Sequence, residues 1–207
     1  MSLSEFFGNL SLFQILTSIV AFLTGIYTFY KSFLEKAKVS LYPGDSVNFV
    51  ISRGGSVTKF HLRCNLVNNG TKAGTLHHLE ALVHCPNGKI YRFFWKLFFE
   101  YTTGGTGVQK GTDPYPIAVM AKNSDLIFIE FEIGSGQQTP HWPPGQYEFQ
   151  IMGWVNKENR SQKDNLKTVF HVEITNDVSS RFEQERPGGP ILVPVPISEW
   201  NIDKEGR

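Results

Sequence analysis

The sequence predicts a mainly β protein, in which a sandwich or barrel of antiparallel strands follows a single apolar helix. Two observations lead to this prediction. Residues 6–30 contain no charged side chain, and from residue 39 onward strand-like runs alternate with turn residues. The runs are rich in β-branched and aromatic residues, and the breaks are rich in Gly, Pro, Asn and Asp. Because no helical pattern lies between the runs, they are typical of an antiparallel sheet protein.

Composition limits the class of protein further. The 207 residues are 41% hydrophobic and 19% charged, which is enough for a core and too little charge for a disordered chain. Lys and Arg number 20 and Asp and Glu number 19, so the net charge is +1. A nucleic-acid-binding protein needs a basic face, so we expect no nucleic-acid partner. Two cysteines argue against a disulfide-rich secreted scaffold.

The first segment, residues 1–38, is predicted to be a membrane anchor with a short linker. As a helix, residues 6–30 would span roughly 37 Å, against a hydrocarbon thickness of ~30 Å. Lys31, Lys36 and Lys38 follow this stretch. Their bias predicts a single-pass protein of the cell membrane whose β-domain faces the cytoplasm. The alternative is a buried or surface amphipathic helix that does not span the bilayer.

One face of the predicted helix is small and weakly polar. Ser18, Ala21, Gly25 and Thr28 recur along it every three or four residues. Small residues allow two helices to approach closely in lipid. The pattern predicts a helix-association face, through which the chain forms a homo-oligomer or binds a partner helix. The alternative is that the hydroxyl groups bond to their own backbone in a lone helix.

Alternation along the strand-like runs predicts one buried and one exposed face for each strand. In the run LIFIEFEI, Glu130 and Glu132 lie on one face. The opposite face is apolar throughout and consists of Ile127, Ile129, Phe131 and Ile133. We therefore expect both carboxylates to face solvent.

Two stretches resemble known families. PPGQYEFQI resembles the start of strand F in immunoglobulin-like sandwiches, and the resemblance implies that the Tyr147 hydroxyl closes a corner against upstream backbone. Phe149 stands where that family has a cysteine, so the inter-sheet disulfide is absent. LVNNGTKAGTLHHLEALVHCPNG resembles uncharacterised bacterial single-pass membrane proteins, and implies architecture without a known activity. Together they imply an immunoglobulin-like β-sandwich over 39–175, preceded by one transmembrane helix.

The remaining segment, residues 176–207, is predicted to be a proline-containing tail that packs on the sandwich or extends from it. Pro194 and Pro196 remove backbone donors, so they favour an edge or extended segment over a central strand. The apolar residues around them are too numerous for a free tail, which favours packing on the body.

The run KIYRFFWKLFFEY carries aromatic residues on both faces. Its odd positions suffice for a core, which leaves Phe94 and Phe98 for the outer face. The pattern predicts an interface patch made of Phe94, Trp95, Phe98 and Phe99, because large exposed apolar patches are usually functional. The alternatives are a strand covered on both sides and a helix over 93–101.

Other reactive groups show no specific pattern. Cys64 and Cys85 lie on strands predicted to be neighbours, and would form a disulfide only outside the cytoplasm. The six histidines lack HExxH or CxxC spacing, so no metal site is predicted. We expect no catalytic residue and no cofactor.

These observations predict a non-enzymatic protein-interaction module, held at the cytoplasmic face of a membrane, with the lipid bilayer and an unidentified protein as partners. The alternative is a β-domain that binds a lipid or small ligand, with a pocket lined by Trp95, Phe98, Phe99, Trp142 and Trp154. A third hypothesis is a hydrolase built on Glu100, Glu130, Glu132 and nearby histidines. It requires converging carboxylates with raised pKa values.

Overall fold

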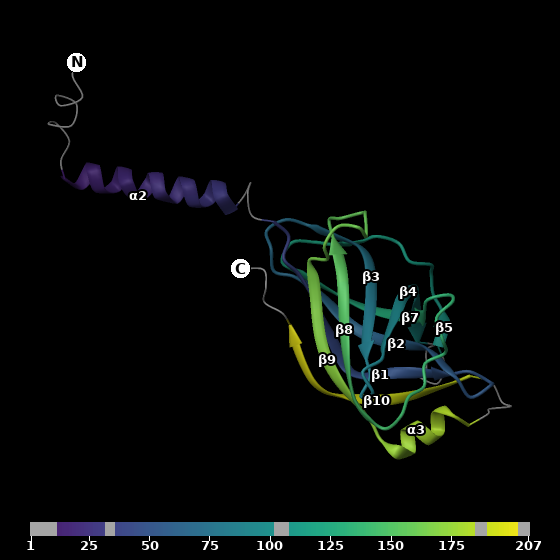
Figure 1. Ribbon diagram of the computed structural model, residues 1–207. Helices are drawn as coiled ribbons and strands as arrows, with labels where there is room; N and C mark the ends of the chain where they lie inside the picture. The colour runs from purple at the N-terminus through teal and green to yellow at the C-terminus, as the bar shows by residue number, and fades with distance from the viewer. Residues whose placement is uncertain (1–11, 32–35, 102–107, 185–189, 203–207) are drawn as a thin grey trace. The chain divides into compact units, whose positions relative to one another are not determined.

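The computed structural model describes residues 12–31, 36–101, 108–184 and 190–202. They belong to two compact units, Met1–Lys36 and Ala37–Arg207. Figure 1 shows the helix α2 of the first unit and the strands of the second. The elements are α2 (Leu12–Phe29), β1 (Val39–Ile51), β2 (Val57–Asn68), β3 (Gly74–His84), β4 (Ile90–Tyr101), β5 (Val108–Lys110), β6 (Ile117–Val119), β7 (Asn123–Ile133), β8 (Gly145–Val155), β9 (Leu166–Ile174), α3 (Asn176–Phe182) and β10 (Ile191–Ile202).

Within the described residues, helix α2 is the counterpart of the predicted anchor. It has 18 residues, about 27 Å at ~1.5 Å per residue, against a hydrocarbon thickness of ~30 Å. Over the described ranges, no helix has the length and apolar character that crossing a membrane requires. The predicted transmembrane helix is therefore wrong, and so is the resemblance to single-pass membrane proteins that implied the same architecture.

Eight of the strands in the second unit close into an antiparallel barrel. Its order is β4-β7-β2-β1-β10-β9-β8-β3, and β3 pairs with β4 to complete the ring. The short strands β5 and β6 pair with β4 and β3 outside this ring. The predicted immunoglobulin-like sandwich is therefore wrong, although the antiparallel, mainly β character is confirmed. Alternation shows which side of a strand is buried, but it does not show which strand is its neighbour, and only the neighbours distinguish a closed ring from two stacked sheets.

Aromatic side chains fill the interior of the barrel. Phe60 of β2 and Phe149 of β8 are fully buried, and their ring centroids lie 5.4 Å apart. Phe49 of β1 also contacts Phe149, at 6.2 Å. Strand β8 is a neighbour of neither β1 nor β2, so the aromatic side chains meet across the interior. The centre of the barrel is therefore a packed core.

Helix α3 packs at one end of this core (Figure 1). Thr175 caps the helix by accepting a hydrogen bond from the backbone N–H of Val178. Phe182 is buried, with its ring centroid 5.0 Å from that of Phe49. Ser179 donates to the backbone oxygen of Trp142 at 2.8 Å, which ties the helix to the β7–β8 connection.

Strand β10 explains how a segment with two prolines enters a barrel. Residues 191–196 are registered against β1, and residues 197–202 against β9. Pro194 and Pro196 therefore lie in the half that pairs with β1, and their side chains are exposed, while Val193 and Val195 are buried. A proline nitrogen costs no ladder hydrogen bond on the side of a strand that is not paired. The segment is thus a barrel strand whose proline-containing half pairs on one side only.

The corner predicted at Tyr147 is present in this different architecture. Its hydroxyl donates to the backbone oxygen of Pro143 at 2.7 Å. Burial raises the pKa of the Tyr147 hydroxyl, which therefore stays a hydrogen-bond donor at neutral pH. The local motif is confirmed, whereas the sandwich that it implied is not.

Candidate functional site

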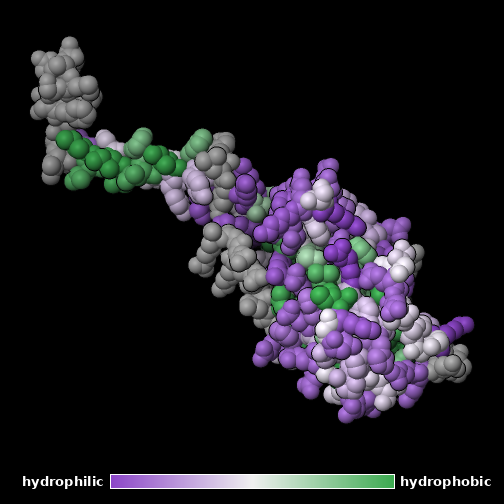
Figure 2. All heavy atoms as spheres, in the orientation of Figure 1, coloured by the Kyte–Doolittle hydropathy of each residue, from purple (hydrophilic) through white to green (hydrophobic). Residues whose placement is uncertain are grey.

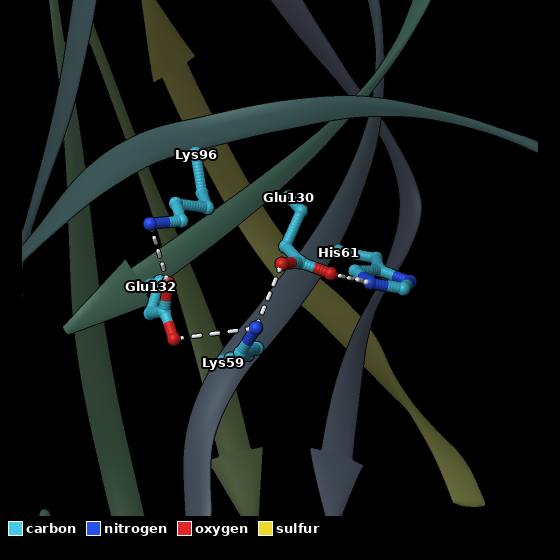
Figure 3. Close-up of polar contacts among 5 residues, drawn as sticks. All are labelled: Lys59, His61, Lys96, Glu130 and Glu132. Atoms are coloured by element: carbon cyan, nitrogen blue, oxygen red, sulfur yellow. Dashed lines mark hydrogen bonds and ion pairs between the residues drawn. The ribbon is translucent and has the colours of Figure 1, made fainter. Parts of the chain in front are cut away.

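A charged cluster lies on the outer face of the barrel, across β2, β7 and β4. We refer to Lys59, His61, Lys96, Glu130 and Glu132 as the outer cluster (Figure 3). On β2 and β7 these residues alternate with inward-facing Phe60 and Phe131. The strand register therefore places their side chains on the side opposite the aromatic core.

Hydrogen bonds and ion pairs link all five residues. His61 Nε2 and Glu130 Oε2 are 2.9 Å apart, and Lys59 Nζ lies 3.1 Å from Glu130 Oε1. Lys59 also reaches Glu132, at 3.2 Å, and Lys96 lies 3.5 Å from the second oxygen of Glu132. Glu130 and Glu132 each lie beside a lysine, so every carboxylate of the cluster has a cationic neighbour.

The electrostatics of the outer cluster favour the ionised forms of two groups. Burial acts to raise the pKa of Glu130, but hydrogen bonds from His61 and Lys59 outweigh it, so the pKa lies below its ordinary value. Burial acts to lower the pKa of Lys59, but bonds and charges from Glu130 and Glu132 outweigh it, so the pKa lies above its ordinary value. Glu130 is therefore a carboxylate and Lys59 an ammonium group at neutral pH.

His61 is the most buried member of the outer cluster, with 4% of its surface exposed. The ring stacks on Phe99 at a centroid distance of 4.2 Å. Because the Glu130 carboxylate only accepts hydrogen bonds, His61 Nε2 carries the proton between them. His61 Nδ1 is buried and has no hydrogen-bond partner among the described residues.

The geometry does not support the hydrolase hypothesis. That hypothesis requires carboxylates with raised pKa values, whereas the pKa of Glu130 is lowered. The side chain of Glu100 lies outside the described residues. Glu130 and Glu132 lie on the outer face, as the alternation predicted, but Glu130 is buried there with 9% of its surface exposed.

The four aromatic residues of the predicted interface patch do not share a face. The pairing of β4 with β7 shifts register between Trp95 and Leu97, which marks a β-bulge at Lys96. Before the bulge Phe94 faces out and Trp95 faces in; after it Phe98 faces in and Phe99 faces out. The extra residue reverses the alternation, so simple parity fails beyond Lys96.

The outward-facing pair is also partly covered. Phe94 is half-buried, and the guanidinium of Arg160 lies 5.8 Å from its ring centroid. Phe99 is buried against His61 and Phe128. The four residues thus divide between the core and two different outer contacts.

The predicted helix-association face lies on α2. Ser18 donates to the backbone oxygen of Gln14 at 2.8 Å, so its hydroxyl is satisfied within the helix. Gly25 lies on the same helix, and a Cβ atom added to it would meet nothing within 4 Å. Ala21 and Thr28 are exposed like Ser18 and Gly25.

Sequence reasoning missed the outer cluster. The available signal was the pair of polar alternations at 59–63 and 130–132, but nothing in the sequence aligns β2 with β7. The register that pairs His61 with Glu130 and Lys59 with Glu132 brings these side chains together.

Among the described residues, the cysteines and histidines do not gather into a catalytic or metal-binding site. Cys64 on β2 and Cys85 after β3 are both free and buried, and β2 and β3 are not neighbours in the sheet. Burial raises the pKa of the Cys85 thiol to about 11, and that of Cys64 is also raised. Within the described part of the chain, no three His, Cys, Asp or Glu side chains are placed to hold a metal ion.

Comparison with known proteins adds little to this geometry. No protein-family model and no curated protein matches the chain. Among solved structures, a Bordetella pertussis protein described as ApaA is similar at 10% identity with a TM-score of 0.30. The match covers 79% of this chain and 90% of that one. The protein is thus defined by its closed, aromatic-filled antiparallel barrel and its outer cluster.

Proposed function

We propose that the chain is a non-enzymatic protein-interaction module, in which the barrel is a rigid body and α2 binds the α2 helix of a second copy. The observation that carries this proposal is the exposed apolar surface of α2, which Figure 2 shows in green. The exposed large side chains of the helix are Leu16, Ile19, Val20, Phe22, Leu23, Ile26, Tyr27 and Phe29. Burial of such a surface against another protein releases the water that covers it.

Two features of α2 favour an identical helix as the occupant. No residue of α2 is charged, so two copies meet without repulsion between like charges. Gly25 costs helix stability relative to Ala, by roughly 0.5–1 kcal/mol, and no neighbour within 4 Å among the described residues requires it. The lack of a side chain at Gly25 would be explained if the backbone of a second helix approaches closely at this position.

Because the core of the barrel is filled, protein interaction is favoured over the binding of a ligand in the barrel centre. Rings from opposite walls, such as Phe60 and Phe149, already occupy that centre. The barrel therefore contributes a stable body, and recognition of a protein partner falls to its outside and to α2.

The test measures the mass of the full-length protein in solution by light scattering during gel filtration. We expect the wild type to exceed the monomer mass and Phe22→Gln/Leu23→Gln to be monomeric. Leu126→Gln is the matched control, because Leu126 is an exposed apolar residue of the barrel, and it should not change the mass.

A third variant separates helix stability from association. Gly25→Leu removes a helix-weakening glycine, yet its side chain blocks close approach, so it should raise helicity and lower association. A monomeric wild type would contradict the proposal. Flotation of the wild type with phosphatidylcholine vesicles, without self-association, would contradict it as well.

A further inference from the structure

Three buried tryptophans of the barrel differ in how their indole groups are satisfied. Trp142 donates from Nε1 to the backbone oxygen of Val57 at 3.1 Å, and Trp154 donates to that of Gln162 at 2.7 Å. Trp95 is equally buried, with 6% of its surface exposed, but its Nε1 has no hydrogen-bond partner among the described residues. A buried donor without an acceptor costs about 1–3 kcal/mol, so such groups call for an explanation.

The backbone around Trp95 is irregular on both sides. The pairing of β4 with β3 is registered from Ile90 to Phe94 and so reaches the residue just before Trp95. On the other side, the register with β7 shifts directly after Trp95. β-Bulges often occur beside binding sites, where they redirect side chains.

Beyond this point β3 and β4 take different partners. Residues 74–76 of β3 pair with β6, and residues 99–101 of β4 pair with β5. Trp95 therefore lies at the position where the ring of strands changes from direct β3–β4 pairing to these two short strands.

A row of aromatic rings leads from Trp95 toward solvent. The Trp95 and Phe98 rings meet edge to face at 4.9 Å and 82°, and the Phe98 and Tyr115 centroids are 5.0 Å apart. Tyr115 is 55% exposed. The row thus has a buried donor at its inner end and an exposed ring at its outer end.

We propose that this aromatic row binds a small, neutral, apolar molecule that carries a carbonyl or similar acceptor, which receives the hydrogen bond from Trp95 Nε1. Aromatic side chains bind the apolar body, and one placed donor fixes the orientation, as in many small-molecule sites. We expect the molecule to be neutral, because Lys96, the cation next to Trp95 in the sequence, already pairs with Glu132 on the outer face and so does not offer its charge to a ligand. The proposal is independent of self-association by α2.

The test uses the neutral aromatic ketone 6-propionyl-2-(dimethylamino)naphthalene, whose emission responds to polarity and hydrogen bonding. Titration of the full-length protein should show saturable binding that Trp95→Phe weakens about five- to tenfold, since an aromatic ring stays at this position while the indole N–H is lost. Trp154→Phe is the control, because its N–H is already bonded to Gln162, and it should leave probe affinity unchanged. Probe bound elsewhere, for example on α2, is the same in all three proteins.

Nuclear magnetic resonance of the wild type gives a second readout that needs no variant. The indole N–H signal of Trp95 should move downfield when the probe is added, while those of Trp142 and Trp154 stay in place. Equal affinity of the wild type and Trp95→Phe would overturn the proposal. An unmoved Trp95 signal at saturating probe would also overturn it.

Discussion

At the scale of single residues, the barrel places polar groups where burial and pairing compete. Glu130 and His61 are nearly excluded from solvent, although both lie on the outer face of the strands. Burial alone would favour neutral side chains there, yet the bonds from Lys59 and His61 keep Glu130 ionised. The stability of this part of the barrel should therefore depend on one carboxylate.

Glu130→Gln should lower the free energy of unfolding at pH 7 by about 2 kcal/mol, because the amide makes weaker hydrogen bonds to Lys59 and His61. The folded-state pKa of Glu130 lies below its ordinary value, so its contribution is present above about pH 4.3 and is lost as the pH falls through the folded-state pKa. Urea unfolding of both proteins between pH 7 and pH 3 should show the difference shrinking at the acid end.

The matched control for that measurement is Glu148→Gln. Glu148 also pairs with a histidine, His171, but its side chain is 42% exposed and the atoms are 3.6 Å apart. Its loss should change the unfolding free energy by no more than about 0.5 kcal/mol. A Glu130→Gln difference that stays constant across the pH range would show that the charge is not responsible.

At the scale of elements, the β-bulge at Lys96 determines the two faces of β4. It allows Trp95 and Phe98 to contact each other inside the barrel although an odd number of positions separates them. It also turns Phe99 outward onto His61. The one inserted residue thus places Phe98 in the core and Phe99 against the outer cluster.

Deletion of Lys96 should be far more damaging than its replacement. Without the extra residue, the strand from Leu97 onward shifts by one position and every following side chain changes face. We expect the deletion to cost more than about 3 kcal/mol or to prevent folding, because it would remove Phe98 from the core.

Lys96→Ala is the control for the deletion. It retains the bulge and removes only an exposed ion pair to Glu132, which is worth about 0.5 kcal/mol. Thermal unfolding followed by circular dichroism distinguishes the two variants. A deletion variant as stable as Lys96→Ala would show that the bulge does not set the faces of β4.

The bulge also shows where sequence-based prediction reached its limit. The strand runs, the inward face of Ile129 and Phe131, and the Tyr147 corner were predictable, because each depends on local spacing. The faces of Phe98 and Phe99 depend on one extra residue that spacing alone does not mark. The outer cluster and the closed ring depend on which strands pair, and the His61–Glu130 contact of the cluster joins residues 69 positions apart.

At the scale of the whole molecule, the barrel depends on its closing strand. β10 is registered with β1 along one half and with β9 along the other, so it connects two strands that do not pair with each other in the sheet. Val193 and Val195 also belong to the core. Removal of β10 would open the ring and expose the backbone edges of two long strands, β1 and β9.

Truncation after residue 190 should therefore abolish the folded monomer. We expect loss of the cooperative thermal transition and aggregation at micromolar concentration, measured by circular dichroism and light scattering. Removal of residues 203–207 is the control, because it leaves β10 whole. A truncated protein that still unfolds cooperatively as a monomer would show that the remaining strands are sufficient.

The pairing of β1 with β10 has a consequence for biosynthesis. Of the barrel strands, β1 is the first to leave the ribosome and β10 is the last, and these two strands pair with each other in the ring. Before β10 emerges, the nascent chain presents β1 with one unpaired edge throughout translation of some 140 residues. Ribosome-associated chaperones that shield such edges should remain bound until β10 is released, and then dissociate.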